Sequence, residues 1–256
     1  MLIKKNILEY KLIILILFFT FTRPSFVVLA QQAMLFLEKG SVKVIGEKGS
    51  RIFRKPGDEE EIFTNDRIQT GKDTIVKIKI IGKPEIIELA ARSFFQLGKI
   101  VRQSSSVSIE IGKARFKITG KRKKRSKKKR FKIRTVTALV GVRGTDFVLG
   151  VSNSQTNLLT ISGSVSFAPV KMPDVEIEVP SNQASMVQQN STPTAPVEVT
   201  PEIKQQIIQS DSSEGFKNVK FGEAVDPEEV RKKKQQEEEQ EEEQEEEQEE
   251  EQEEEQ

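Results

Sequence analysis

The stretch FKIRTVTALVGVRGTDF, residues Phe131–Phe147, predicts a strand, a tight turn and a second strand. Apolar residues alternate with Lys132 and Arg134 at its start, as in a strand that buries one face. Two close glycines, Gly141 and Gly144, then interrupt the pattern before a second apolar run begins. An ordinary core hairpin would show the same turn chemistry, so the pattern alone predicts structure and not function.

The turn is expected to form around Gly144. Glycine adopts φ > 0 without steric cost and also permits a close backbone approach. Thr145 and Asp146 are expected to close the turn, because their side-chain oxygens can accept hydrogen bonds from nearby backbone N–H groups. Arg143 and Asp146 could form either a functional pair or a staple of the turn. Their position inside the stretch favours the staple.

Four segments extend the pattern along the chain. Gly57–Asp58 and the string DRIQTG at 66–71 precede the central stretch, and LLTISGSV at 158–165 and PSNQA at 180–184 follow it. With them, the stretch resembles the FecR domain, a module of bacterial envelope proteins. The positions that carry the central resemblance are Thr135, Ala138, Val142, Arg143, Gly144, Thr145, Asp146 and Phe147. Val136 departs from the family pattern, which has proline there, and predicts a continuous strand in place of a rigid turn.

The resemblance implies a β-solenoid-like, open β-prism or sandwich fold, and a role in signalling. FecR domains in iron-transport signalling receive a signal from an outer-membrane receptor and relay it inward. That arrangement places a cytoplasmic sigma-regulating segment before a membrane span. Only about eleven residues precede the first apolar run of this sequence, so direct control of a sigma factor is not expected.

Period-two alternation predicts further strands. Residues 42–44, 76–80, 107–111 and 116–118 alternate apolar with polar side chains, and glycine or proline recurs between them. Many short strands separated by such turns predict an all-β domain. Residues 84–98 could form a short helix instead, although strands are favoured there.

The residue types that the chain lacks exclude several kinds of active site. Cys, His and Trp are absent, so neither Ser-His-Asp and Cys-His nucleophilic sites nor the usual zinc sites can form. The remaining carboxylates show no spacing that indicates the catalytic pair of a glycoside hydrolase. We therefore expect no enzyme activity, no cofactor and no metal site. The absence of Cys does not indicate a cellular compartment.

Residues 1–30 have the pattern of an export signal. A lysine-containing start leads into the apolar run Leu12–Phe21, Arg23–Pro24 breaks the run, and cleavage is expected after Ala30. A spanning helix needs about 20 apolar residues, more than this run provides. The predicted location is therefore the periplasm. An uncleaved segment would instead anchor the protein in the inner membrane.

Three further parts are expected after the signal. The FecR-like β domain occupies 34–187, a largely irregular linker follows at 188–236, and five copies of EEEQ form an acidic tail at 237–256. Glutamates that neighbour one another without cations disfavour a helix, so the tail is expected to be disordered.

A basic loop interrupts the β domain at 121–130. Nine of its ten residues are cationic, which predicts an extended loop at the tip of a hairpin. It contains no aromatic residue for base stacking, and the export signal also argues against nucleic acid as a partner. A solvated loop without a specific partner is the simplest interpretation. The candidate residues for binding a polyanionic lipid or polysaccharide are Lys121, Arg122, Lys123, Lys124, Arg125, Lys127, Lys128, Lys129 and Arg130.

The charge of the chain is strongly polarised. Its net charge of +2 becomes +17 without the 15 glutamates of the tail, and +14 when residues 1–30 are also removed. A flexible tail has an effective concentration in about the mM range near its own domain, so an intramolecular contact between tail and basic loop is expected to form.

Two functions fit the sequence. In one, the β domain is an exported interaction module that binds another envelope protein and relays a signal. In the other, the chain is a structural, envelope-binding protein whose basic loop binds polyanions. Salt separates the two, because binding through charges weakens steeply as salt rises.

Overall fold

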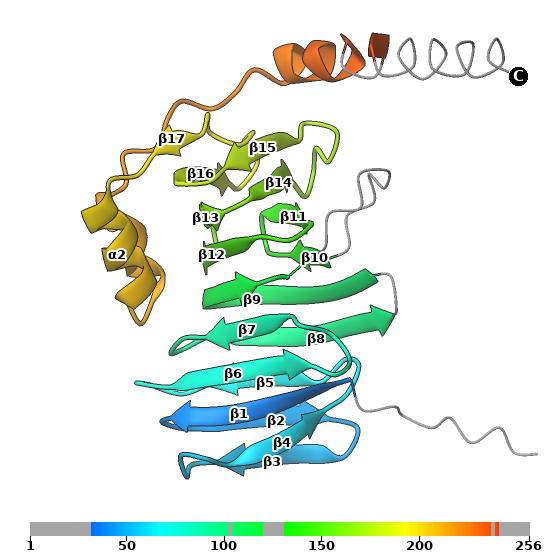
Figure 1. Cartoon of the computed structure of the whole chain (residues 1–256), viewed down its shortest axis with the longest axis vertical. Helices are drawn as coiled ribbons and strands as arrows, with labels where there is room; N and C mark the ends of the chain where they lie inside the picture. Colours follow the sequence, from blue (N-terminus) through cyan, green and yellow to red (C-terminus); the bar gives the residue numbers. More distant parts are fainter. Residues whose placement is uncertain (1–31, 102–103, 120–130, 237–238, 241–256) are drawn as a thin grey trace, which may run out of the picture. The chain divides into compact units, whose positions relative to one another are not determined.

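The structure is a computed structural model that describes residues 32–101, 104–119, 131–236 and 239–240. Its strands, β1 to β17, form one hydrogen-bonded network that divides into two sheets (Figure 1). The prediction of an all-β fold with an open sheet arrangement is confirmed. Residues 1–30, the basic loop at 121–130 and all but residues 239–240 of the acidic tail lie outside the described residues.

Both sheets follow a simple order. Sheet A is antiparallel and runs β4 (Glu59–Ile62), β1 (Ala33–Lys39), β6 (Ile75–Ile80), β7 (Ile86–Leu89), β9 (Ser104–Lys117), β12 (Asp146–Val151), β13 (Gln155–Ser162), β16 (Gln183–Gln188) and β17 (Val197–Glu198). Sheet B runs β3 (Gly49–Phe53), β2 (Val42–Gly46), β5 (Arg67–Thr70), β8 (Phe94–Val101), β9, β10 (Phe131–Arg134), β11 (Ala138–Val142), β14 (Ser164–Pro169) and β15 (Ile177–Pro180). Its β9–β10 pair is parallel.

Strand β9 belongs to both sheets. Its first part, up to Ile111, pairs with β8 in sheet B, and its last part, from Gly112, pairs with β7 and β12 in sheet A. Gly112 has φ +107°, which favours glycine. A Cβ at this position would also lie 2.3 Å from the Ser93 hydroxyl. Glycine is therefore required where the strand passes from one sheet to the other.

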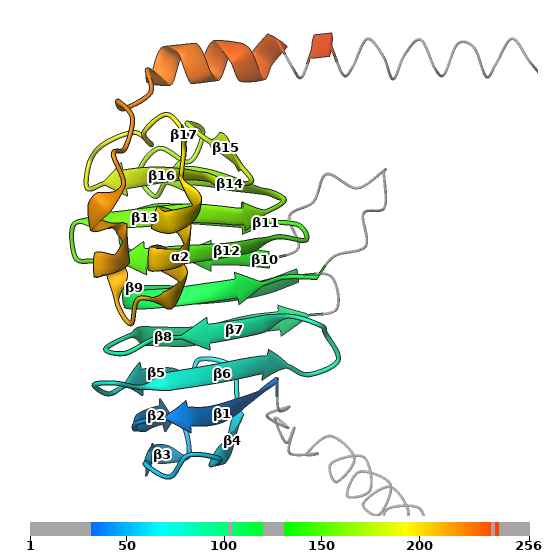
Figure 2. The ribbon, with the colours of Figure 1, turned by 60° about the vertical axis from the view of Figure 1, so that its left-hand side comes forward.

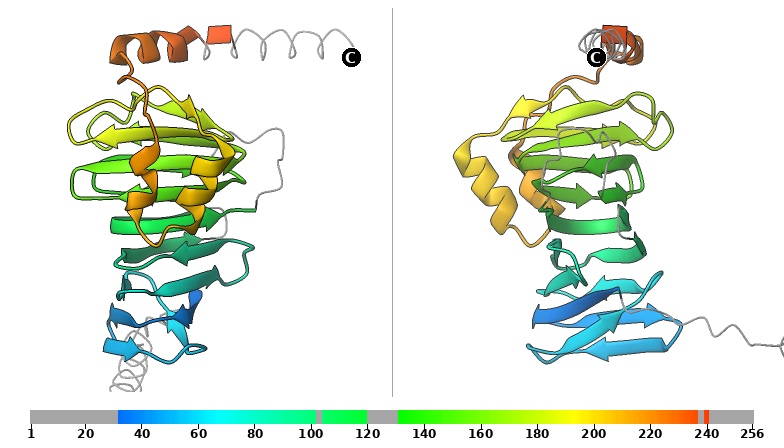
Figure 3. Two further views of the ribbon diagram at one scale, coloured as in Figure 1. Left: turned by 90° about the vertical axis from the view of Figure 1, so that its left-hand side faces the viewer. Right: turned by 45° about the vertical axis from the view of Figure 1, so that its right-hand side comes forward.

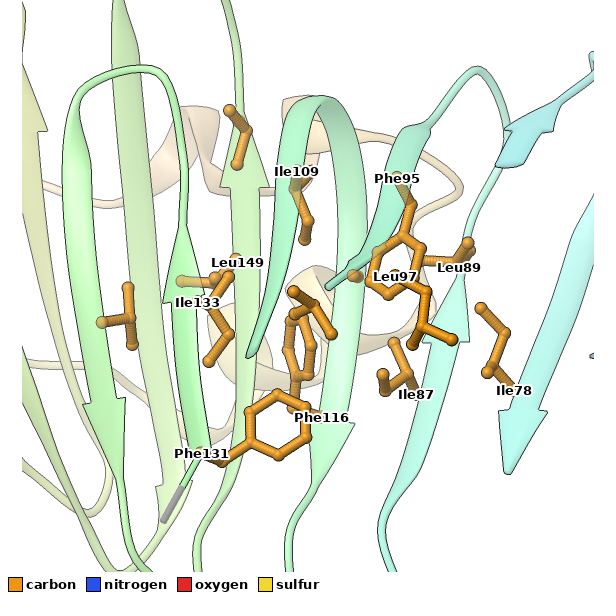
Figure 4. Packing of buried hydrophobic residues seen from close by; sticks show 14 of the residues in the cluster. Ile78, Ile87, Leu89, Phe95, Leu97, Ile109, Phe116, Phe131, Ile133 and Leu149 are labelled. Carbon is orange, nitrogen blue, oxygen red and sulfur yellow. The ribbon is translucent and has the colours of Figure 1, made fainter. Parts of the chain in front are cut away.

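The core lies between the two sheets. The alternation predicted for β10 is present, because Phe131 and Ile133 are buried whereas Lys132 and Arg134 are exposed. Figure 4 shows how side chains from β6 to β12 meet in this core. Burial of this kind contributes about 25 cal/mol for each Å² of apolar surface removed from water.

Three phenylalanines pack at the centre of the core. The ring of Phe116 stacks on Phe147 with centroids 5.0 Å apart, and it meets Phe131 edge-on at 6.0 Å. The three rings come from β9, β12 and β10, so both sheets contribute. Such aromatic pairs contribute about 0.5–1.5 kcal/mol beyond the burial of their area.

Two local predictions have different outcomes. Residues 84–98 form strand β7 and the start of β8, as favoured. A continuous strand through Val136 is wrong, since residues 135–137 turn the chain between β10 and β11, which pair antiparallel. The turn does not need proline because the Thr135 backbone N–H donates to Ala138 O at 2.9 Å, and the Thr135 hydroxyl accepts from the Ala138 N–H at 2.8 Å.

The expected irregular linker at 188–236 is also wrong for much of its length. It contains β17, the helix α2 (Pro201–Gln209) and the 3₁₀ helix η1 (Ser213–Asn218). Figure 2 and the left view of Figure 3 show α2 in front of the strands of sheet A, and the right view of Figure 3 shows it to one side of them. Ile207 of α2 and Phe216 of η1 are buried against the outer face of sheet A, in a second apolar cluster.

The start of α2 has a recognisable signal. Thr200 is its N-cap, with the hydroxyl accepting from the Ile203 N–H, and Pro201 opens the helix. The helix is short, so its apolar residues did not stand out as a periodic pattern. Among the described residues, no helix is sufficiently long and apolar to cross a membrane.

Candidate functional site

The residues of the central motif are largely structural. Ala138, Val142 and Phe147 are buried in the core, and Thr135 and Thr145 are almost fully buried. Gly144 has φ +82°, as expected for the turn between β11 and β12. The motif therefore fixes the path of three strands through both sheets.

Three threonine hydroxyls form a buried network beside the turn at 135–137. The hydroxyl of Thr156 lies 2.7 Å from that of Thr135 and 2.8 Å from that of Thr137. Thr137 also donates to the Val187 carbonyl at 3.1 Å. The network ties the turn between β10 and β11 to β13 and β16 through hydrogen bonds, which accounts for the spacing of Thr135 and Thr137.

The predicted closure of the turn by Thr145 and Asp146 is wrong. The Asp146 carboxylate instead accepts two hydrogen bonds from Arg115 of β9, at 2.9 Å to Nε and 2.7 Å to Nη2. This bidentate bond raises the pKa of Arg115. The Thr145 hydroxyl is buried and has no hydrogen-bond partner among the described residues. Asp146 therefore staples β12 to β9.

The DRIQTG segment also stabilises turns. The Asp66 carboxylate accepts from the Phe63 N–H at 3.1 Å, while burial raises its pKa. The Thr70 hydroxyl accepts from the Ser93 N–H at 2.7 Å and donates to the Ala90 carbonyl at 2.7 Å. Asp66 thus closes the turn between β4 and β5, and Thr70 ties β5 to the turn between β7 and β8.

Lys113 was not predicted from the sequence. It is only 4% exposed, and its Nζ donates to the carbonyls of Ile208, at 2.9 Å, and Ser210, at the end of α2. Burial lowers its pKa to about 8. Gly112 before it was expected to separate two strands, and nothing local indicated a partner 95 residues further along the chain.

A groove lies on the outer face of sheet B, beside the central motif. It has a volume of about 370 Å³ and is lined by Ser106, Lys132, Arg134, Leu139, Ala168 and Glu176, among others. We call it the sheet B groove. Its residues come from β9, β10, β11, β14 and the segment before β15.

Strand register explains the hollow. Lys132 lies opposite Gly141, and Gly141 lies opposite Ser166, so the middle of this row has no side chain or a small one. In the next row Arg134 faces Leu139, and Leu139 faces Ala168. The result is a largely apolar floor with two exposed cations along β10. The predicted binding residues 121–130 precede this strand directly and lie outside the described residues.

The described residues contain no group of three or more acidic side chains placed to hold a metal. The positions in the groove offer cations and apolar surface, which suits the binding of an anionic or amphipathic chain.

Residues 66–166 match the family model described as FecR protein. The chain carries a FecR domain. The matched range begins at Asp66 and ends in β14, so it contains the whole central motif. No curated protein matches the sequence.

Two of the solved structures that resemble the chain come from one organism. Both are crystal structures of a candidate anti-sigma factor from Parabacteroides distasonis ATCC 8503, at 2.50 Å and 1.65 Å resolution. Each has a TM-score of 0.46 and 15% identity, and the similarity covers 56% of this chain. It spans 64% and 65% of those two chains, less than two thirds of their length.

Proposed function

We propose that the chain is an exported, non-enzymatic interaction module of the bacterial envelope. Its FecR domain binds another protein and relays a signal through that contact. The export pattern at 1–30 and the family match at 66–166 support the location and the class of function.

The sheet B groove is the observation on which the binding role rests. At the level of β12, β13 and β16, the outer face of sheet A is covered by α2 and η1 of the same chain. The outer face of sheet B carries a groove of about 370 Å³ with an apolar floor at Leu139 and Ala168. An apolar hollow rimmed by polar groups is typical of a binding site. Any partner would therefore contact strands that the family motif holds in place.

An electrostatic function is the second candidate. Lys132 and Arg134 continue the charge of the basic loop onto the rim of the groove. A polyanionic lipid or polysaccharide would bind there through charges alone. Such binding falls steeply with salt, whereas binding to the apolar floor persists.

A crosslinking pull-down from cells separates the two functions. The wild-type chain is compared with Leu139→Glu, which charges the groove floor, and with a variant whose residues 121–130 are a Gly/Ser linker. Ile52→Glu is the control, because Ile52 is an equally apolar side chain of sheet B, 50% exposed, far from the groove in the strand order.

We expect the wild-type chain to capture a partner protein that remains bound in a high-salt wash. Leu139→Glu should abolish this capture, whereas the Gly/Ser linker variant and the Ile52→Glu control should retain it. Capture of lipid or polysaccharide that disappears with the linker or with salt would favour the electrostatic function. Capture unaffected by Leu139→Glu would reject the groove as the binding surface.

A further inference from the structure

The C-terminal segment leaves the described structure close to the sheet B groove. Its residues 223–225 are held by backbone hydrogen bonds: Ala195 N–H donates to Glu223 O at 2.8 Å, and Val225 N–H donates to Pro193 O at 2.9 Å. Helical turns follow at 227–236. Residues 223–225 are therefore held against the segment at 193–195, which follows β16 of sheet A.

One contact brings this segment to the wall of the groove. Arg231 Nε donates to the Asp174 carboxylate at 2.7 Å, and this bond lowers the pKa of Asp174. Asp174 follows Pro173, which lines the groove, and precedes the lining residue Glu176 by two positions. The pair is exposed and contributes little stability by itself. It does, however, place Arg231, six residues before the acidic tail, next to the wall of the groove.

The length of chain beyond this point is sufficient to reach back. Residues 241–256 number sixteen, and an extended chain spans about 3.3 Å for each residue, or about 50 Å in all. Ten helical residues at 227–236 extend only about 15 Å. The end of the tail can thus return to the groove from which it departs.

Charge gives the groove and the tail opposite signs. The tail carries 15 Glu without a cation, and the groove presents Lys132 and Arg134, both exposed, along β10. The methylene groups of Glu and Gln can cover the apolar floor at Leu139 while carboxylates reach these cations. Glu176 lies on another part of the lining, so the carboxylates are expected on the β10 side.

We propose that the acidic segment 241–256 docks in the sheet B groove, with its glutamates against Lys132 and Arg134. The docked tail occupies the surface that a partner protein needs, so the partner must displace it. This regulatory role rests on the proposed function, whereas the docking itself does not.

Paramagnetic NMR tests the docking in the full chain. The protein has no cysteine, so Gln248→Cys gives a single site in the tail for a nitroxide label. At low salt, the amides of Lys132, Arg134 and Gly141 are expected to lose intensity. This loss should disappear in the Lys132→Gln/Arg134→Gln variant and in about 1 M salt, where the screening length is about 3 Å.

A matched control removes two charges from the same face of sheet B at a distance. Lys43→Gln/Arg67→Gln, on β2 and β5, should leave the loss of intensity unchanged. Loss confined to residues 121–130, or retained in Lys132→Gln/Arg134→Gln, would overturn the proposal. Loss that appears only between labelled and unlabelled copies would do so as well, since the groove would then hold a second copy.

The result is independent of the pull-down, because no partner is present in the NMR sample. If NMR shows no docked tail but the pull-down still captures a protein through the groove, only the tail contact is rejected. A docked tail with no captured protein would reject only the proposed function.

Discussion

At the scale of single residues, hydroxyl groups determine how the central turn is held. Thr156 is fully buried, and its hydroxyl bonds to the hydroxyls of Thr135 and Thr137. Thr156→Val keeps the shape but removes both bonds, so we expect the free energy of unfolding to fall by about 1–2 kcal/mol. Denaturant unfolding measures this, with Ser50→Ala on the exposed edge strand as the control. Equal stabilities of the variant and the wild type would mean that the network does not stabilise the fold.

A second residue-scale prediction concerns Lys113. Its pKa is lowered to about 8 from 10.5, so between these pH values the unfolded chain binds more protons than the folded chain. The contribution of Lys113 to the free energy of unfolding therefore rises as pH increases from about 8 to 10.5, and it is lost as pH falls back through 8. The full difference is at most about 3 kcal/mol.

The measurement compares the wild type with Lys113→Met from pH 7.5 to 10. The stability of the wild type relative to the variant is expected to increase as pH rises. The charged groups that influence the pKa of Lys113 are Asp211, Arg115 and Glu88. A constant difference between the two proteins would show that Lys113 is not buried as described.

At the scale of elements, the cover of sheet A depends on one glycine. A Cβ at Gly150 of β12 would lie 2.9 Å from the ring of Phe216 in η1. Gly150→Ala is expected to displace η1 and to lower the free energy of unfolding by about 1–3 kcal/mol. Hydrogen exchange of the amides at 213–219 should accelerate in the variant.

A double mutant provides the control for this contact. Phe216→Leu removes part of the ring that the new methyl group would meet, so Gly150→Ala should be less destabilising in that background. Additive effects of the two substitutions would indicate that the strain arises elsewhere in β12.

The elements also show which features the sequence could predict. Alternation in β10 was readable because each strand buries one face, and the turn at Gly144 was readable because its φ favours glycine. The bond between Asp146 and Arg115 was not, because the two residues are 31 positions apart and meet only through strand pairing. The helix α2 was not predicted because it is short and its apolar residues show no clear helical periodicity. Its position is determined by packing against the outer face of sheet A.

At the scale of the whole molecule, the predicted export leads to a defined product. Cleavage after Ala30 would give a mature chain that begins at Gln31. We expect the protein from the periplasmic fraction to have this N-terminus when its intact mass and terminal peptide are measured. A protein that retains Met1 and fractionates with the inner membrane would instead support the anchored alternative.

The candidate site could be predicted only in part at this scale. The sequence located the FecR domain and the cations at 121–130, because both are local strings. The sheet B groove was not predictable, since Leu139 and Ala168 become neighbours only through the pairing of β11 with β14. Two small or absent side chains in one row create the hollow, and no single segment contains that row.

Because β9 belongs to both sheets, it affects the order in which the chain can fold. A ribosome releases the N-terminal strands first, so β7 and β8 are complete while their neighbour is still being made. Both then present open edges, which are sites where strands of other molecules can add. A single 14-residue strand later closes the two edges together. A chain that ends before residue 104 therefore leaves both edges open, and we expect it to aggregate more readily than a chain that includes β9.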